Sequence, residues 1–212
     1  MAEYGHVRER VRDLAVRAWD VPGIVARYRR LLVDGIPRKD LDVSGILTRT
    51  QEILDRVQWK AEEYEYLGHN CAKGAALAVM EEFGLGSVEM LKGLSAFPGF
   101  GVTGSVCGAV SGALFVFGLY FGRDDMTDYG ATGAAITAAR VFIPRFEAQL
   151  GSILCPRIQE DYIFGRYLDA RASPEHMATF IQEQGYAKCA LPAGVGARLA
   201  AELIIESLQA TP

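Results

Sequence analysis

Four cysteines, Cys71, Cys107, Cys155 and Cys189, are the residues of this sequence with the clearest chemical potential. The thiolate form of cysteine binds metals and attacks disulfides. Four thiolates could therefore ligate an iron–sulfur cluster, hold a structural zinc ion, or cycle between dithiol and disulfide. Consecutive cysteines are 36, 48 and 34 residues apart, without the close pairs typical of zinc sites. Spacing alone also leaves open four inert core cysteines.

The predicted helix boundaries place each cysteine at the start of a helix. The expected starts are Asn70–Cys71, Ser105–Cys107, Cys155–Pro156 and the segment from Cys189 to Leu191. Unpaired backbone N–H groups and the positive end of the helix dipole stabilise negative charge there. This setting lowers the pKa of a thiol, so the pattern favours four working cysteines over inert ones.

Helical periodicity extends along nearly the whole chain, and no run of strict alternation indicates a strand. We expect an all-α fold, a compact multi-helix bundle with an N-terminal helical extension. Residues 1–66, with 12 basic and 12 acidic side chains, form the extension, and residues 67–212 form the core domain. The expected helices span 7–18, 24–33, 44–66, 71–83, 87–94, 105–121, 128–150 (kinked or divided by Pro144), short segments from 155 and from 173, and 191–208.

Composition excludes several classes of protein. The net charge of −4 disfavours nucleic-acid binding, and the early arginines alternate with acids as on a solvated helix face. The N-terminus lacks an apolar leader, so we expect a cytoplasmic protein with reduced thiols. The uncharged stretch from Gly93 to Gly122 is interrupted by Pro98 and several glycines, which favours a buried core helix over a membrane span.

The neighbours of the cysteines resemble a known pattern. Cys107-Gly-Ala-Val-Ser-Gly112 is similar to the CGAxxG signature of the C_GCAxxG_C_C family, and Asn70-Cys71-Ala72 is similar to that family's first cysteine element. A Gly-rich stretch at 99–104 precedes the second cysteine, as in the family. Further matches are the Gly-Leu-Tyr-Phe-Gly segment ending at Gly122, the residues Phe142, Phe146, Gly151 and Ser152 before Cys155, and Cys189 ahead of the last helix. The resemblance covers about residues 68–208.

The resemblance implies a redox-active protein, with all four cysteines as its site. A similar domain accompanies a haem domain in split-Soret cytochromes, where an iron–sulfur centre is present. The chain has no Cys-x-x-Cys-His, so the resemblance implies an iron–sulfur cluster, for instance [2Fe–2S], without haem. Electron transfer would require a redox partner protein, and two chains could share clusters as a homodimer. Whether the protein is itself an oxidoreductase stays open.

Two other functions remain open at this point. A metal-free dithiol/disulfide enzyme or sensor would use the same cysteines, and a structural zinc or helical interaction module would use them without redox chemistry. His69 could carry protons, although a capping or surface role fits it better; His6 and His176 fit exposed helix positions. Arg140 and Arg145 could pair with an anion or with a nearby acid such as Glu147. The aromatic residues expected to shield a cluster are Phe97, Phe100, Phe115, Phe117, Tyr120 and Phe121.

Overall fold

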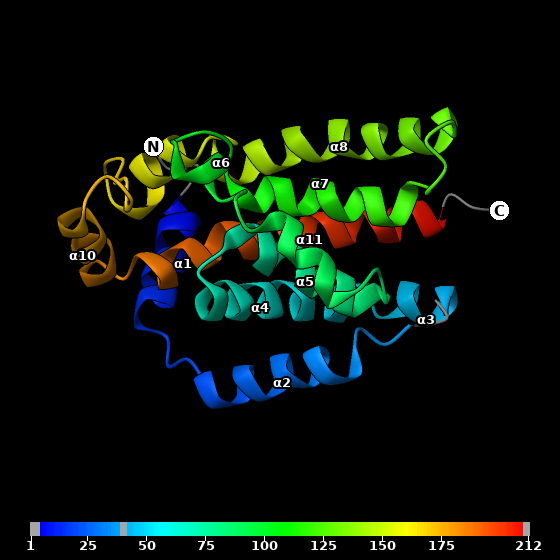
Figure 1. Cartoon of the computed structure of the whole chain (residues 1–212), viewed down its shortest axis with the longest axis horizontal. Coiled ribbons are helices and arrows are strands. Elements are labelled where there is room, and N and C mark those ends of the chain that lie inside the picture. The colour runs from blue at the N-terminus through cyan, green and yellow to red at the C-terminus, as the bar shows by residue number, and fades with distance from the viewer. Residues whose placement is uncertain (1–4, 39–41, 210–212) are drawn as a thin grey trace.

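The computed structural model describes residues 5–38 and 42–209, which form an all-α bundle (Figure 1). The helices are α1 (Gly5–Val16), α2 (Val21–Asp34), α3 (Val43–Thr48), α4 (Thr50–Gly68), α5 (Cys71–Phe83), η1 (Val88–Leu94), α6 (Gly99–Val102), α7 (Gly108–Phe121), α8 (Tyr129–Leu150), α9 (Cys155–Ile158), η2 (Gln159–Ile163), α10 (Pro174–Gln182) and α11 (Gly185–Gln209). Within these residues the fold contains no β-strand, only an isolated bridge between Val106 and Leu154. The all-α prediction is therefore confirmed.

Several helix boundaries follow from local capping signals. Asn70 accepts a hydrogen bond from the backbone N–H of Lys73 and begins α5, which ends where Gly84 adopts the left-handed conformation. Asp128 caps α8 in the same way, and Ser173 caps α10. Pro144 lies inside α8 without dividing it. The helix expected over 44–66 is two helices, because Arg49 closes α3 and α4 starts one residue later.

Four helices, α4, α5, α7 and α11, form the centre of the bundle. Glycine permits the closest approaches between them. A Cβ at Gly74 of α5 would lie 2.8 Å from the backbone nitrogen of Glu65 on α4, and a Cβ at Gly112 of α7 would lie 2.4 Å from the carbonyl oxygen of Ala72 on α5. Since no side chain separates the backbones at these points, α4 and α7 both lie directly against the N-terminal half of α5.

The N-terminal helices join the same hydrophobic core as the rest of the chain. Val7 and Leu14 of α1, Ile24 of α2 and Val57 of α4 are buried in one cluster with residues of α5, α7 and α11. In Figure 1, α2 runs along the outer side of α4, while α8 covers α7 on the opposite side of the bundle. The division at residue 66 stays a prediction, but α4 packs as an integral member of the central four helices.

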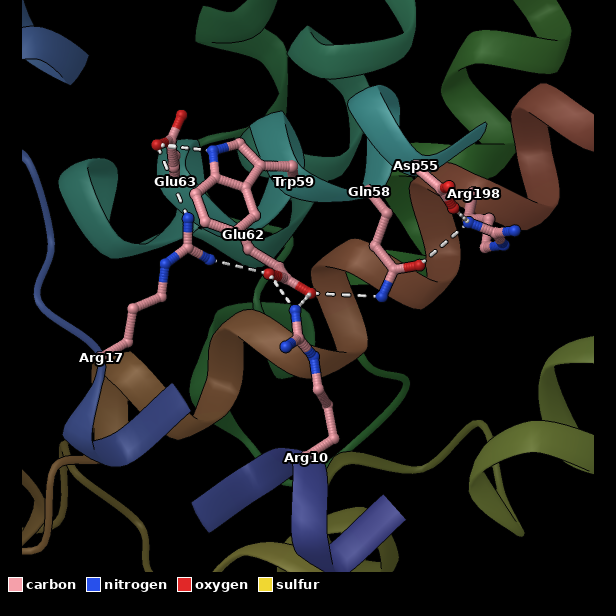
Figure 2. Close-up of polar contacts among 8 residues, drawn as sticks. All are labelled: Arg10, Arg17, Asp55, Gln58, Trp59, Glu62, Glu63 and Arg198. Atoms are coloured by element: carbon pink, nitrogen blue, oxygen red, sulfur yellow. Dashed lines mark hydrogen bonds and ion pairs between the residues drawn. The ribbon is translucent and has the colours of Figure 1, made fainter. Parts of the chain in front are cut away.

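Ion pairs connect α1 and the residue that follows it to α4 (Figure 2), and a further ion pair connects α2 to α4. The fully buried carboxylate of Glu62 receives Arg10 and Arg17, each with a nitrogen 2.9 Å from Oε2. Neighbouring Glu63 binds Arg27 of α2 with a nitrogen–oxygen distance of 2.5 Å. Three of the early arginines, which the sequence suggested to be on a solvated helix face, therefore supply cations to two buried glutamates.

Candidate functional site

A cavity of about 630 Å³ opens between α4, α5, the glycine-rich loop, η2 and the start of α11. Cys71, Cys155 and Cys189 all line it, as does Glu65 of α4. Cys107 is buried beside Cys71, and the two thiols are hydrogen-bonded. The structure therefore brings together, in one neighbourhood, cysteines that lie up to 118 residues apart in the chain.

Three of the four cysteines lie at the start of a helix, as predicted. Cys71 is the first residue of α5, Cys107 is the N-cap of α7, and Cys155 is the first residue of the short α9. The cap of α7 is Cys107 itself, two residues beyond the expected Ser105. The backbone N–H groups of Gly108 and of Cys71 itself lower the pKa of Cys71, as expected at such termini, although larger effects outweigh them.

The prediction for Cys189 is wrong. This residue lies inside α11, whose first residue is Gly185, and Pro192 also lies within the helix instead of at its start. The helix begins earlier because the segment before Pro192 packs against the core, with Ala187, Ala190 and Leu191 buried. Burial of this apolar face outweighs the preference of proline for a first turn.

A backbone pairing holds Cys107 and Cys155 near each other. The N–H of Cys107 donates to the carbonyl of Ile153 at 2.8 Å, and the N–H of Cys155 donates to the carbonyl of Ser105 at 2.9 Å. These bonds flank the antiparallel bridge between residues 106 and 154. The second and third cysteines of the sequence are thus fixed by one element that connects the start of α7 to the start of α9.

The glycine-rich loop at residues 99–104 lies against Cys155, and the first residue of α7 lies against Cys71. A Cβ at Gly99 would lie 3.8 Å from the Cys155 sulfur, whereas a Cβ at Gly108 would lie 2.5 Å from the Cys71 sulfur. Non-glycine residues with positive φ gather around this region: His69, Phe100, Val102 and Gln184 are the ones in the described chain. Strained backbone of this kind concentrates at functional sites.

The pKa values of Cys71, Cys155 and Cys189 are raised, contrary to the lowering expected at helix starts. The pKa of Cys71 lies well above its ordinary value because of its hydrogen bond to Cys107, its burial and the negative charge of that neighbour. Burial, with repulsion from Cys71, raises the pKa of Cys155 to about 12 despite the hydrogen bond from Gln159 Nε2 at 3.6 Å. Burial also raises the pKa of Cys189. Dipole stabilisation is outweighed because several acidic groups share one apolar site.

Sequence reasoning missed Glu65 and Gln159, two buried polar residues of the cavity. Glu65 is 3% exposed, accepts a hydrogen bond from the backbone N–H of Asn70, and has no partner for Oε2. Its pKa is raised well above the ordinary value by burial and then by Cys71. Gln159, at the start of the π-helical η2, also accepts from the N–H of Leu168. The burial of Glu65 and the π-helical conformation of η2 result from tertiary packing, so no sequence pattern predicts them.

The other residues that the sequence suggested as candidates make structural contacts or are exposed. His69 ends α4 in the left-handed conformation, and its ring stacks on Tyr186 at the cavity with 3.5 Å between centroids. Arg145 binds Glu206 of α11 instead of Glu147, with a nitrogen–oxygen distance of 2.7 Å. His6, His176 and Arg140 are exposed. The aromatic lining comes from Tyr167, Phe180 and Tyr186 and not from the six residues expected, which lie elsewhere.

Among the residues that the structure describes, no three Cys, His, Asp or Glu side chains are placed to hold a single metal ion. Across residues 5–38 and 42–209, no helix combines the length and the apolar character that a membrane crossing demands.

Comparison with protein families identifies the pattern of the cysteines. The model of the family described as "Putative redox-active protein (C_GCAxxG_C_C)" matches residues 69–203. The chain belongs to this family. The matched C_GCAxxG_C_C segment contains all four cysteines and begins four residues after Glu65. Neither the curated proteins nor the solved structures gave a match to the chain.

Proposed function

We propose that this C_GCAxxG_C_C protein is an electron-transfer protein whose cysteine cavity holds an iron–sulfur cluster. The observation that carries the proposal is the gathering of Cys71, Cys155 and Cys189 around one cavity, with Cys107 hydrogen-bonded to Cys71. Their donor chemistry fits, because iron–sulfur clusters are held by cysteine thiolates. Repulsion among these thiolates, which raises their pKa values in the metal-free protein, would be relieved by bound cations.

The chain itself supplies the surroundings that such a centre needs. A bound cluster would exchange single electrons with a partner protein. Backbone N–H groups at the starts of α5 and α7 face the Cys71 sulfur and favour its charged form, and the amide of Gln159 donates to the Cys155 sulfur. Such hydrogen bonds to ligand sulfur tune a reduction potential, and the aromatic lining limits access of water. A reducing cytoplasmic setting, a redox partner protein and a homodimer that shares clusters belong to the same proposal.

A second function is favoured by the direct contact between Cys71 and Cys107. In a dithiol mechanism, the Cys71 thiolate attacks a disulfide substrate, forming a mixed disulfide and releasing one substrate thiolate. Cys107 then attacks the Cys71 sulfur and releases the second substrate thiol, so the two cysteines are oxidised as the substrate disulfide is reduced. This mechanism needs two cysteines in contact, whereas Cys155 and Cys189 would be dispensable.

Anaerobic purification followed by iron, sulfide and visible-absorption measurements tests the leading proposal. We expect a coloured protein that contains iron and acid-labile sulfide and is bleached by dithionite. A colourless, iron-free protein that fails to take up iron and sulfide on reconstitution would contradict the cluster. Stoichiometric oxidation of Cys71 and Cys107 by a disulfide, lost in Cys107→Ala and retained in Cys155→Ala, would then support the dithiol function.

A further inference from the structure

Three thiols and one carboxyl line the cavity, together with the imidazole of His69, whose ring is stacked on Tyr186. Cys71, Cys155, Cys189 and Glu65 line the cavity, whereas Cys107 is not among the described residues that line it. Cys107 is 5% exposed, and its contact with the other thiols is the hydrogen bond to Cys71. The carboxyl of Glu65 lines the cavity where Cys107 does not, which makes it the candidate for a fourth ligand.

Glu65 is held in this position by the packing of α4 on α5. The close contact at Gly74 brings the backbone of Glu65 against α5, three residues beyond Cys71. Asn70, which caps α5, donates its backbone N–H to the Glu65 carboxylate. The same residue therefore orients both Cys71, through the helix cap, and Glu65, through its N–H.

The free oxygen of Glu65 indicates a missing ligand. Oε2 is fully enclosed and has no hydrogen-bond partner, and none of the ion pairs in the described chain includes Glu65. By contrast, the buried carboxylates of Glu62 and Glu63 on the same helix each bind arginine. An unpaired buried carboxyl is costly, and carboxylate oxygen is an established metal ligand.

We propose that Cys71, Cys155, Cys189 and Glu65 are the ligands of the metal centre, and that Cys107 is a positioning residue acting through its contact with the Cys71 sulfur. This inference rests on the iron–sulfur function proposed above and replaces one of its four cysteine ligands. A cluster fits these groups better than one ion, because no three such side chains of the described residues are placed to hold a single ion and each cluster ligand can bind a different iron. The carboxylate comes from α4, outside the segment that matches the family.

The test compares Glu65→Gln with Glu62→Gln in full-length protein loaded with iron and sulfide under anaerobic conditions. Both variants make the same isosteric change at a buried position of α4, but Glu62 binds Arg10 and Arg17 away from the cavity. The rate of iron release to bathophenanthroline should rise about 10-fold or more in Glu65→Gln, since even indirect partners of a metal change affinity by that factor. Glu62→Gln should release iron at the wild-type rate.

Two further variants separate ligation from folding. Glu65→Cys should retain iron and shift the sulfur-to-iron charge-transfer bands, whereas a merely structural carboxyl would not be replaced by a thiol. Cys107→Ala should keep its iron with an altered spectrum, whereas Cys155→Ala should lose it. Retention of iron by Glu65→Gln together with its loss from Cys107→Ala would overturn the ligand set and leave the cluster intact as a proposal. Absence of iron from the wild-type protein would instead overturn both.

Discussion

Alanine at Gly112 should weaken the junction between α5 and α7 on which Cys71 and Cys107 depend. An added Cβ would lie 2.4 Å from the carbonyl oxygen of Ala72 and 3.1 Å from its carbonyl carbon. Ordinary van der Waals contact begins at 3.4 Å, so the two backbones would have to separate by about 1 Å. The obstructing atoms belong to the backbone of α5 and cannot rotate away.

The free-energy change has two opposing parts. Forcing an extra carbon into a packed interface costs about 1–3 kcal/mol. Alanine also favours a helix by about 1 kcal/mol over glycine, which offsets part of that cost. We therefore expect Gly112→Ala to lower the free energy of unfolding by about 0–2 kcal/mol. Gly118, exposed on the same helix with no atom within 4 Å of its added Cβ, provides a matched control. Gly118→Ala should raise the free energy of unfolding by about 0.5–1 kcal/mol.

Urea unfolding of the reduced, metal-free variants measures both effects, and the difference between them should be about 2 kcal/mol. Metal-free protein keeps any change in cluster binding out of the comparison. If Gly112→Ala proved as stable as Gly118→Ala, α5 and α7 would not be in the close contact described, and the placement of Cys71 beside Cys107 would lose its support.

Three further predictions concern the network on α4 and the thiols. Glu62→Gln should lower the free energy of unfolding by about 3 kcal/mol in urea titrations, because Arg10 and Arg17 lose the charge of a fully buried partner, whereas Arg17 keeps Glu63 at 3.6 Å and Arg10 is 37% exposed; a loss below about 1 kcal/mol would contradict the network. Gly108→Ala should displace the Cys71 sulfur, 2.5 Å from the added Cβ, and reduce the iron retained after reconstitution while far-UV circular dichroism stays helical; undiminished iron would argue against Cys71 as a ligand. Because its pKa of about 12 keeps Cys155 protonated at pH 8, iodoacetamide should modify it more slowly in the folded metal-free protein than in urea, and equal rates by peptide mass spectrometry would refute that environment.

Features that depend on neighbouring residues could be predicted from the sequence. The boundaries of α5 follow from Asn70 and Gly84, and the start of α8 follows from Asp128, because a cap bonds to backbone only two or three residues away. The helix start at Cys155 is likewise a local consequence of Pro156. For this reason, the sequence could predict that three of the four cysteines lie at helix starts.

Features that depend on packing between distant segments could not be predicted. The placement of Cys189 inside α11 reflects burial of the residues before Pro192, which competes with a local proline signal and prevails. The raised pKa values of the thiols need the cavity, because burial and mutual repulsion exist only once the helices have assembled. The pairing of residues 105–107 with 153–155 crosses 48 positions and carries no pattern in either segment.

The N-terminal helices α1 and α2 help to position Glu65 at the cavity. Three buried glutamates occur within four residues of α4, and arginines of α1 and α2 accompany Glu62 and Glu63. Glu65 is the exception, because its neighbours are thiols. The cations fix α4 to the helices before it, and α4 in turn fixes Glu65 at the cavity. With Glu65 as a ligand, the segment before the family match is part of the redox centre. Weakening the Arg17–Glu62 pair should then accelerate loss of iron only under conditions that begin to unfold the protein. Glu65→Gln should accelerate loss of iron in the fully folded state.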